Sequence, residues 1–195
     1  MIHDPTILPS GLPVPEDDGA AAHLHGAAVP ALALPATDGR QIRLERPPPG
    51  FDRLVVYAYP WTGRPGEPLL TPDWDSIPGA RGCTPESCGF RDHAAELGRA
   101  GAAVVGLSAQ ASDEQQETAE RLGLPFPLVS DADLRFARAL GLPTFEAGGR
   151  TLLKRLTLVI RDGGVEHVFY PVFPPDTHAA EVLAWLTREA VAAGR

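Results

Sequence analysis

The sequence is poor in the features that would mark several large classes of protein. Its 195 residues include 17 basic and 25 acidic side chains, a formal net charge of −8 without a basic cluster, which argues against a nucleic-acid partner. No apolar run approaches the ~18 residues of a membrane span, so we expect no membrane partner. The first residues lack the basic and apolar regions of a signal peptide, and we therefore expect a cytoplasmic location.

Cysteine is also scarce, with only Cys83 and Cys88 in the chain. In the cytoplasm thiols are kept reduced, so the pair favours a catalytic or metal-binding role over a structural disulfide. A metal site could recruit His93, but this histidine lies five residues beyond Cys88 and no second cysteine pair exists. Redox chemistry is therefore the stronger interpretation.

Length and composition predict one folded domain. A chain of this size is most simply a single domain, and its 44% hydrophobic residues can bury a full core. Residues 1–25 are rich in proline, alanine and acidic residues without periodicity. We therefore expect a flexible N-terminal extension over residues 1–25 and a domain over residues 26–195.

Alternating strand and helix patterns predict an α/β fold. Residues 54–59 are an apolar run typical of a central strand, and the proline- and glycine-rich residues 60–82 are expected to form a long loop. Further strands are expected at residues 102–107, 126–129, 152–160 and 165–170, and a hairpin is expected to join residues 31–34 to 41–44. Helices are expected from residue 84 and at residues 112–122, 133–140 and 177–193. This order indicates a parallel sheet extended by antiparallel strands, with helices on both faces.

Both cysteines lie at a predicted helix start. Thr84, Pro85 and Glu86 match an N-cap hydroxyl, a first-turn proline and a first-turn acid. Cys83 would then lie at the positive helix end, after a strand, where a thiolate is favoured. Cys88 lies about 7.5 Å further along the helix axis, and a disulfide needs a Cα separation of roughly 4.4–6.8 Å. A bridge between them would require the helix to unwind.

Several stretches resemble the peroxiredoxins of the Q type, also called bacterioferritin comigratory proteins. The most specific is Gly-Cys-Thr-Pro-Glu-Ser-Cys-Gly-Phe-Arg-Asp at residues 82–92. The other stretches are residues 34–39, 55–60, 105–108, 155–160 and 164–169. The resemblance covers most of residues 26–190 and implies a thioredoxin-like fold, in which a central mixed sheet is flanked by helices on both faces.

The resemblance also implies a thiol-dependent peroxidase that reduces hydrogen peroxide and organic hydroperoxides. Cys83 matches the family's peroxidatic cysteine, Cys88 its resolving cysteine and Arg155 its active-site arginine. Cys83 would become a sulfenic acid, Cys88 would condense with it, and thioredoxin or a similar thiol would reduce the disulfide. This cycle needs no metal or organic cofactor, and we expect a monomer or weak homodimer.

Three further residues are expected near the substrate, and one expected group is missing. Glu86 complements the helix dipole, and the resemblance suggests that it orients an active-site arginine; Arg81 would add positive potential. The family usually has a threonine or serine three residues before the peroxidatic cysteine and a proline seven before it, where this chain has Ala80 and Ser76. We expect Thr62 or Ser76 to supply the hydroxyl through the enlarged loop at residues 61–79.

Two other functions fit the same cysteine pair. A thiol–disulfide oxidoreductase acting on proteins usually carries Cys-x-x-Cys, so the four residues between Cys83 and Cys88 count against it. A non-enzymatic redox sensor on the same fold is favoured by the missing hydroxyl at position 80. Insulin reduction and the rate of Cys83 oxidation separate these alternatives from a peroxidase.

Overall fold

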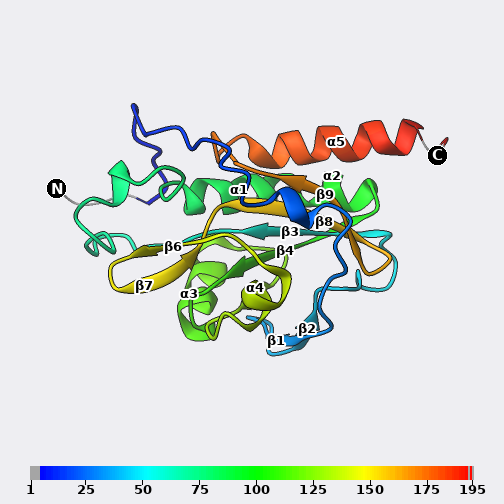
Figure 1. Cartoon of the computed structure of the whole chain (residues 1–195), viewed down its shortest axis with the longest axis horizontal. Coiled ribbons are helices and arrows are strands. Elements are labelled where there is room, and N and C mark those ends of the chain that lie inside the picture. The colour runs from blue at the N-terminus through cyan, green and yellow to red at the C-terminus, as the bar shows by residue number, and fades with distance from the viewer. Residues whose placement is uncertain (1–4, 193, 195) are drawn as a thin grey trace.

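The computed structural model describes residues 5–192 and 194, and its centre is a five-stranded sheet in the order β5-β4-β3-β8-β9 (Figure 1). The strands are β3 (Arg53–Ala58), β4 (Ala102–Ser108), β5 (Leu128–Ser130), β8 (Leu156–Arg161) and β9 (Gly164–Phe169). Strand β4 is parallel to β3 and β5, whereas β8 is antiparallel to β3 and β9. The predicted mixed sheet is confirmed.

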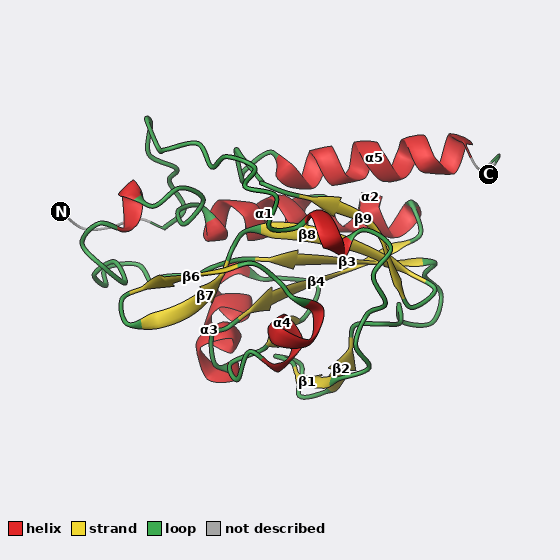
Figure 2. Cartoon of the chain, in the orientation of Figure 1, coloured by secondary structure: helices red, strands yellow, loops and turns green. Residues whose placement is uncertain are grey.

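Helices and a small hairpin cover the two faces of this sheet. One face carries α1 (Cys83–Asp92), α2 (Ala94–Arg99) and α5 (His178–Ala192), as Figure 2 shows. The other face carries α4 (Arg135–Leu140) and the hairpin of β1 (Ala33–Pro35) and β2 (Gln41–Arg43). Helix α3 (Ser112–Leu122) packs beside the edge strand β5.

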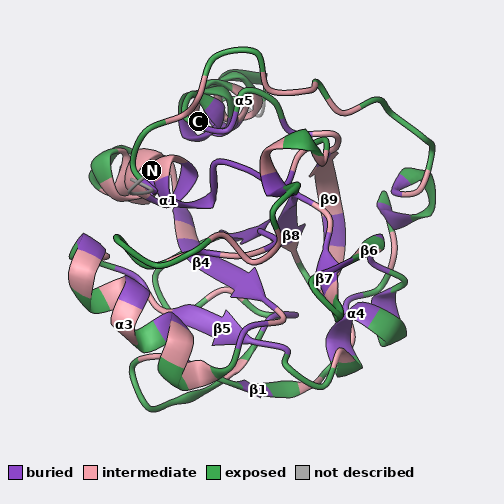
Figure 3. Cartoon of the chain, turned by 90° about the vertical axis from the view of Figure 1, so that its left-hand side faces the viewer, coloured by how far each residue is buried: buried purple, intermediate pink, exposed green. Residues whose placement is uncertain are grey.

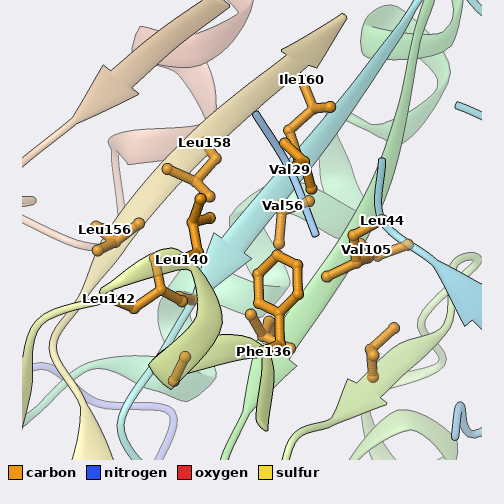
Figure 4. Packing of buried hydrophobic residues seen from close by; sticks show 14 of the residues in the cluster. Val29, Leu44, Val56, Val105, Phe136, Leu140, Leu142, Leu156, Leu158 and Ile160 are labelled. Atoms are coloured by element: carbon orange, nitrogen blue, oxygen red, sulfur yellow. The ribbon is translucent and has the colours of Figure 1, made fainter. Parts of the chain in front are cut away.

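Strand β3 divides the core into two layers because its side chains alternate between the faces. Val55 and Tyr57 pack with Phe90 of α1, while Leu54 and Val56 pack on the α4 side. Figure 4 shows the α4 side, where Phe136 faces side chains from β3 and β8. Figure 3 shows that the sheet strands β4 and β5 are buried, whereas the edge strand β9 is largely intermediate and the helices expose their outer surfaces. Helices on both faces leave every residue of β3 buried, as the continuous apolar run predicts.

Several predicted elements differ from the observed ones in detail. The single helix expected after residue 84 is divided into α1 and α2 at His93. The apolar spacing continues across this division, so the sequence pattern gives no sign of it. The strand expected at residues 152–160 is divided into β7 (Arg150–Leu153) and β8, so Arg155 lies in the connection between them. Strand β6 (Thr144–Ala147), which pairs with β7, was not predicted.

The N-terminal segment contains core residues. We expected a flexible extension through residue 25, yet Leu24 is fully buried, Ala21 is almost fully buried, and both lie in the core cluster on the α4 side. The amide of Gly26 donates to the carbonyl oxygen of Val165 at 2.8 Å and joins this segment to β9. Two apolar residues in a polar, proline-rich context give no periodic signal, so the sequence hides this packing. Residues 1–4, and residue 193 at the end of the last predicted helix, lie outside the described residues.

Replacing His178 with glutamine is expected to change the pH dependence of stability. His178 is buried between Phe90 and Phe169, and its Nε2 lies 2.9 Å from the Thr157 hydroxyl oxygen. Burial lowers the pKa of His178 to about 4, with Glu181 opposing the shift. The unfolded chain therefore binds a proton at His178 below pH ~6.5, whereas the folded chain binds it only near pH 4. This difference lowers the free energy of unfolding by about 3 kcal/mol as the pH falls from 6.5 to 4.

The measurement is the free energy of unfolding by urea at several pH values between 4.5 and 7.5. Burial raises the pKa of Glu86 to about 7, so Glu86 increases stability as the pH falls through the same window. The pH dependence of the wild type alone therefore does not give the contribution of His178. The difference between the wild type and His178→Gln isolates it, and this difference should shrink as the pH falls. A difference that stays constant from pH 7.5 to 4.5 would contradict the assignment.

Candidate active site

Cys83 is the first residue of α1, at the end of the loop that follows β3. The N-cap is Gly82, not the predicted Thr84, and its backbone is left-handed with φ of 105°. Only glycine fits there, because a Cβ atom would lie 2.3 Å from Cγ of Pro175. This close approach holds the Cys83 side chain at the positive end of the helix, 2% exposed.

Arg155 brings a guanidinium group to the same point from a distant part of the chain. Its Nη2 donates to Sγ of Cys83 at 3.1 Å, and its Nη1 forms a buried ion pair with Glu86. The same guanidinium donates to the carbonyl oxygens of Gly79, Ala80 and Arg81 at 3.1–3.3 Å. Arg155 therefore organises both the thiol and the turn that leads into α1.

The Cys83 thiol is held by opposing electrostatic effects. Burial raises the pKa of Cys83, Arg155 lowers it, Glu86 raises it, and the backbone N–H of Trp61 lowers it. Burial is the largest effect, so the pKa is raised overall, in contrast to the readily ionised thiol that the helix start predicts. Sγ lies 3.6 Å from the carbonyl oxygen of Ala80, which accepts a hydrogen bond from the protonated thiol.

Glu86 lies behind the arginine and not at the mouth of the site. Its side chain is fully buried, and its Oε1 has no hydrogen-bond partner within the described part of the chain. Burial raises the pKa of Glu86 to about 7 although Arg155 opposes the shift. The geometry supports the expected orientation of Arg155 and gives Glu86 no direct route to a substrate.

Replacing Glu86 with glutamine is expected to lower the pKa of the Cys83 thiol. The amide removes the negative charge that raises this pKa, while its oxygen can still accept a hydrogen bond from Arg155. The rate of iodoacetamide alkylation in a Cys88→Ser background should therefore reach half its maximum at a lower pH. Glu120→Gln, which neutralises an exposed carboxylate of α3, is the matched control. An unchanged midpoint would contradict the proposed coupling.

Within the described part of the chain, neither hydroxyl that was expected to replace the missing one forms a hydrogen bond with Cys83. The Thr62 hydroxyl donates to Oε1 of Gln110 at 3.0 Å and lies 2.9 Å from the Thr118 hydroxyl, in a buried network on the α3 side. Ser76 is exposed. The prediction that Thr62 or Ser76 replaces this hydroxyl therefore gains no support. Besides the Arg155 guanidinium, the Ala80 carbonyl and the Trp61 amide meet the sulfur, and no side-chain pattern can reveal these two backbone groups.

A small cavity gives access to Cys83. It has a volume of about 20 Å³, and Arg81 lines it while also pairing with Asp75 at 3.3 Å. The other lining residues are Pro5, Trp61, Gly63, Pro68, Leu69, Leu70, Trp74, Gly82, Cys83 and Thr84. A much larger groove of about 670 Å³ lies at the other ends of β3 and β4 and shares no lining residue with this cavity. The thiol chemistry therefore belongs to the smaller cavity.

The enlarged loop is a folded wall of this cavity. Trp74 of a short 3-10 helix (Trp74–Ser76) is buried with Ala80 and Leu152 against the β6–β7 hairpin, and Trp61, Leu69, Leu70, Ile77 and Phe145 pack around them. The guanidinium of Arg150 lies 4.7 Å from the Trp61 ring centroid. The aromatic residues pack the loop, as expected, and narrow the entrance to Cys83.

Cys88 lies one helical turn further along α1 and is half-buried. Both thiols are free, and α1 is helical through both positions. A disulfide between them requires the first turn of α1 to open, as the spacing predicts. Within the described residues, no group of three or more histidine, cysteine and acidic side chains is placed to hold a metal ion.

Known proteins align with most of this chain. Residues 24–183 match the Redoxin family. The peroxiredoxin Bcp of Escherichia coli (strain K12) is 32% identical over 171 residues, which cover 85% of this chain and 96% of that protein. The chloroplastic peroxiredoxin Q of Oryza sativa subsp. japonica is 31% identical over 163 residues, 81% of this chain but only 64% of the longer plant protein.

Solved structures agree with these matches. Peroxidoxin BcpB of Mycobacterium tuberculosis superposes with a TM-score of 0.64 and 31% identity, covering 84% of this chain and 96% of that one. A bacterioferritin comigratory protein of Xanthomonas campestris, studied for its alkyl peroxide reduction activity, superposes with a TM-score of 0.62 and 28% identity, over 84% and 99% of the two chains. The predicted thioredoxin-like fold is confirmed.

Proposed function

The chain belongs to the redoxin family, with the peroxiredoxin Q and Bcp proteins as relatives, and from this premise we propose that it is a thiol-dependent peroxidase acting through Cys83. The observation that carries the proposal is the 3.1 Å contact between Nη2 of Arg155 and Sγ of Cys83, at a helix N-terminus beside a small cavity. This arrangement supplies a nucleophile and positive charge where a peroxide oxygen would gain negative charge. The substrates are hydrogen peroxide and organic hydroperoxides.

The first step forms a sulfur–oxygen bond. The thiol of Cys83 loses its proton, and its thiolate attacks one peroxide oxygen. The oxygen–oxygen bond breaks, and the second oxygen leaves with the electron pair and takes up a proton as water or an alcohol. Cys83 becomes a sulfenic acid. Arg155 donates to the sulfur in the resting state, so its fork of donors is in place to stabilise the leaving oxygen.

The second half of the cycle uses Cys88. Once the first turn of α1 opens, the Cys88 thiolate attacks the sulfur of the sulfenic acid, a disulfide forms and water leaves. A dithiol donor then reduces the disulfide by exchange and is itself oxidised. We propose thioredoxin or a similar protein as the donor. Protein side chains and the donor supply all the chemistry, so the proposed cycle uses no metal or organic cofactor.

Location and assembly remain predictions. No helix among the described residues combines the length and apolarity that a bilayer span requires. Relatives include chloroplast proteins as well as a bacterial one, so the family leaves the compartment open. We propose a cytoplasmic protein that is a monomer or weak homodimer, and gel filtration with light scattering would test the oligomeric state.

The test of function is peroxide consumption with a thioredoxin, thioredoxin reductase and NADPH as electron source. We expect NADPH oxidation that depends on both peroxide and this protein. Two observations favour a slow redox sensor instead, namely the raised pKa of Cys83 and the missing hydroxyl at position 80. Oxidation of Cys83 by hydrogen peroxide no faster than that of a free thiol would support the sensor, and insulin reduction without peroxide turnover would support a thiol–disulfide oxidoreductase.

A further inference from the structure

Residues 5–18, here called the N-terminal arm, cross the mouth of the Cys83 cavity. Pro5 is buried and lines this cavity together with Cys83. The guanidinium of Arg81 donates to the Ile7 carbonyl oxygen at 3.3 Å. Leu8 packs against Gly82, since its Cδ1 would lie 3.0 Å from a Cβ atom added to that glycine. Figure 1 shows this blue segment beside the start of α1. The arm therefore forms part of the closed entrance to the thiol.

The other end of the arm is anchored behind the active-site arginine. The Asp18 carboxylate accepts from Nζ of Lys154 at 2.6 Å and from the Tyr170 hydroxyl at 2.7 Å. Pro15 and Glu16 line a second cavity, of about 220 Å³, together with Arg155. The arm thus reaches from the sulfur side to the arginine side of the same site.

The anchor of the arm at Asp18 is weak. Residues 5–18 contain no helix or strand, and the Asp18–Lys154 pair is exposed, so water and salt screen it. The chain becomes fixed only at Ala21 and Leu24, which lie in the core. The Redoxin match begins at residue 24, so the arm lies outside the part shared with the family. The arm can leave the entrance without disturbing the core.

The size of the closed cavity points to a role in selectivity. Its volume of about 20 Å³ matches about one molecule of the size of water or hydrogen peroxide and is smaller than an alkyl or aryl hydroperoxide requires. We propose that the N-terminal arm sets the size selectivity of peroxide reduction, an inference that rests on the proposed peroxidase function. The closed arm admits hydrogen peroxide, and its release at Asp18 admits bulky organic hydroperoxides to the same Cys83 chemistry.

The variant Asp18→Asn tests the arm because it weakens both anchor contacts at an exposed position. The measured quantity is kcat/KM for cumene hydroperoxide divided by kcat/KM for hydrogen peroxide. This ratio should rise about fivefold, because losing an exposed ion pair shifts the equilibrium between the closed and the open arm by about that factor. Asp133→Asn, which removes one exposed negative charge elsewhere, is the matched control and should leave the ratio unchanged. Salt at ~1 M should raise the ratio in the wild type and have little effect in Asp18→Asn.

A second measurement does not depend on peroxidase activity. In a Cys88→Ser background, Cys83 is alkylated with small iodoacetamide and with a bulky aryl maleimide. Asp18→Asn should accelerate the bulky reagent more than the small one, because iodoacetamide needs a smaller opening of the arm than the aryl maleimide does. Equal acceleration of both reagents, or the same ratio change in Asp133→Asn, would overturn the arm's role. If the unmodified protein consumes no peroxide, the proposed function fails, and the alkylation result still decides whether the arm restricts access.

Discussion

Cys83→Ser is expected to abolish peroxide turnover, with a loss of at least about 1,000-fold in kcat/KM, the order seen when a catalytic nucleophile is removed. A serine hydroxyl stays protonated at neutral pH and is a poor nucleophile toward an oxygen–oxygen bond. The buried position next to Arg155 changes little in volume, so the fold should persist. The measurement is peroxide-dependent NADPH oxidation with thioredoxin, combined with circular dichroism to confirm folding.

The matched variant is Cys88→Ser, which leaves the attacking sulfur in place. It should consume one equivalent of peroxide per chain and then stop with thioredoxin as donor, because no intramolecular disulfide forms. Mass spectrometry should find one added oxygen atom on Cys83. Sustained turnover by Cys83→Ser with thioredoxin would refute the assignment of Cys83 as the attacking thiol, and full turnover by Cys88→Ser would refute the resolving role of Cys88.

Arg155→Met is expected to lower both activity and stability. Activity should fall about 100- to 1,000-fold in kcat/KM, because the positively charged donor at the sulfur is lost. Stability should fall by about 3–5 kcal/mol, because the buried Glu86 carboxylate loses its ion-pair partner and three backbone carbonyls lose a donor. Urea unfolding and steady-state kinetics measure the two effects.

The loss of stability carries a pH signature. Arg155 lowers the pKa of Glu86, so its removal raises that pKa further above its unfolded value. The folded state then holds a proton that the unfolded state releases near pH 4.5, and stability falls as the pH rises through neutrality. The destabilisation by Arg155→Met should therefore be larger at pH 8.5 than at pH 6. A penalty independent of pH would show that Glu86 is not the group left unpaired.

Two variants separate charge from geometry at this position. Arg155→Lys keeps the positive charge but lacks the fork that reaches Cys83, Glu86 and the backbone carbonyls together, so it should recover only part of the activity. The double variant Arg155→Met, Glu86→Gln should recover stability and remain inactive, because it removes the unpaired charge without restoring a donor at the sulfur. Activity recovered by the double variant would contradict a direct role for Arg155.

Local sequence patterns predicted most of the secondary structure because strands and helices report their period within a few residues. The apolar run at residues 54–59 is β3, and the stretch at residues 82–92 begins α1 with Cys83 at its first residue. The spacing of Cys83 and Cys88 also showed that a disulfide needs the helix to open. These statements depend on neighbouring residues, so a single sequence suffices for them.

The predictions that failed in detail depended on contacts from distant parts of the chain. Gly82 precedes α1 at a point where Pro175 leaves no space for a Cβ atom, and Arg155 lies between β7 and β8 with its guanidinium at Cys83. The same dependence explains the Thr62 prediction: proximity to Pro60 in the sequence did not determine that its hydroxyl meets Gln110 and Thr118 instead. A local pattern carries no information about such partners.

The sequence by itself determined Cys83 and Cys88 as the candidate reactive pair, the strand and helix that frame them, and the family to which the chain is similar. Only the tertiary structure brought Arg155 across 72 positions to the sulfur, placed Glu86 behind it and closed the entrance with the N-terminal arm. It also reversed the expected shift in the pKa of Cys83. A helix start favours the thiolate through neighbouring backbone groups, whereas burial that opposes it comes from segments far away in the sequence.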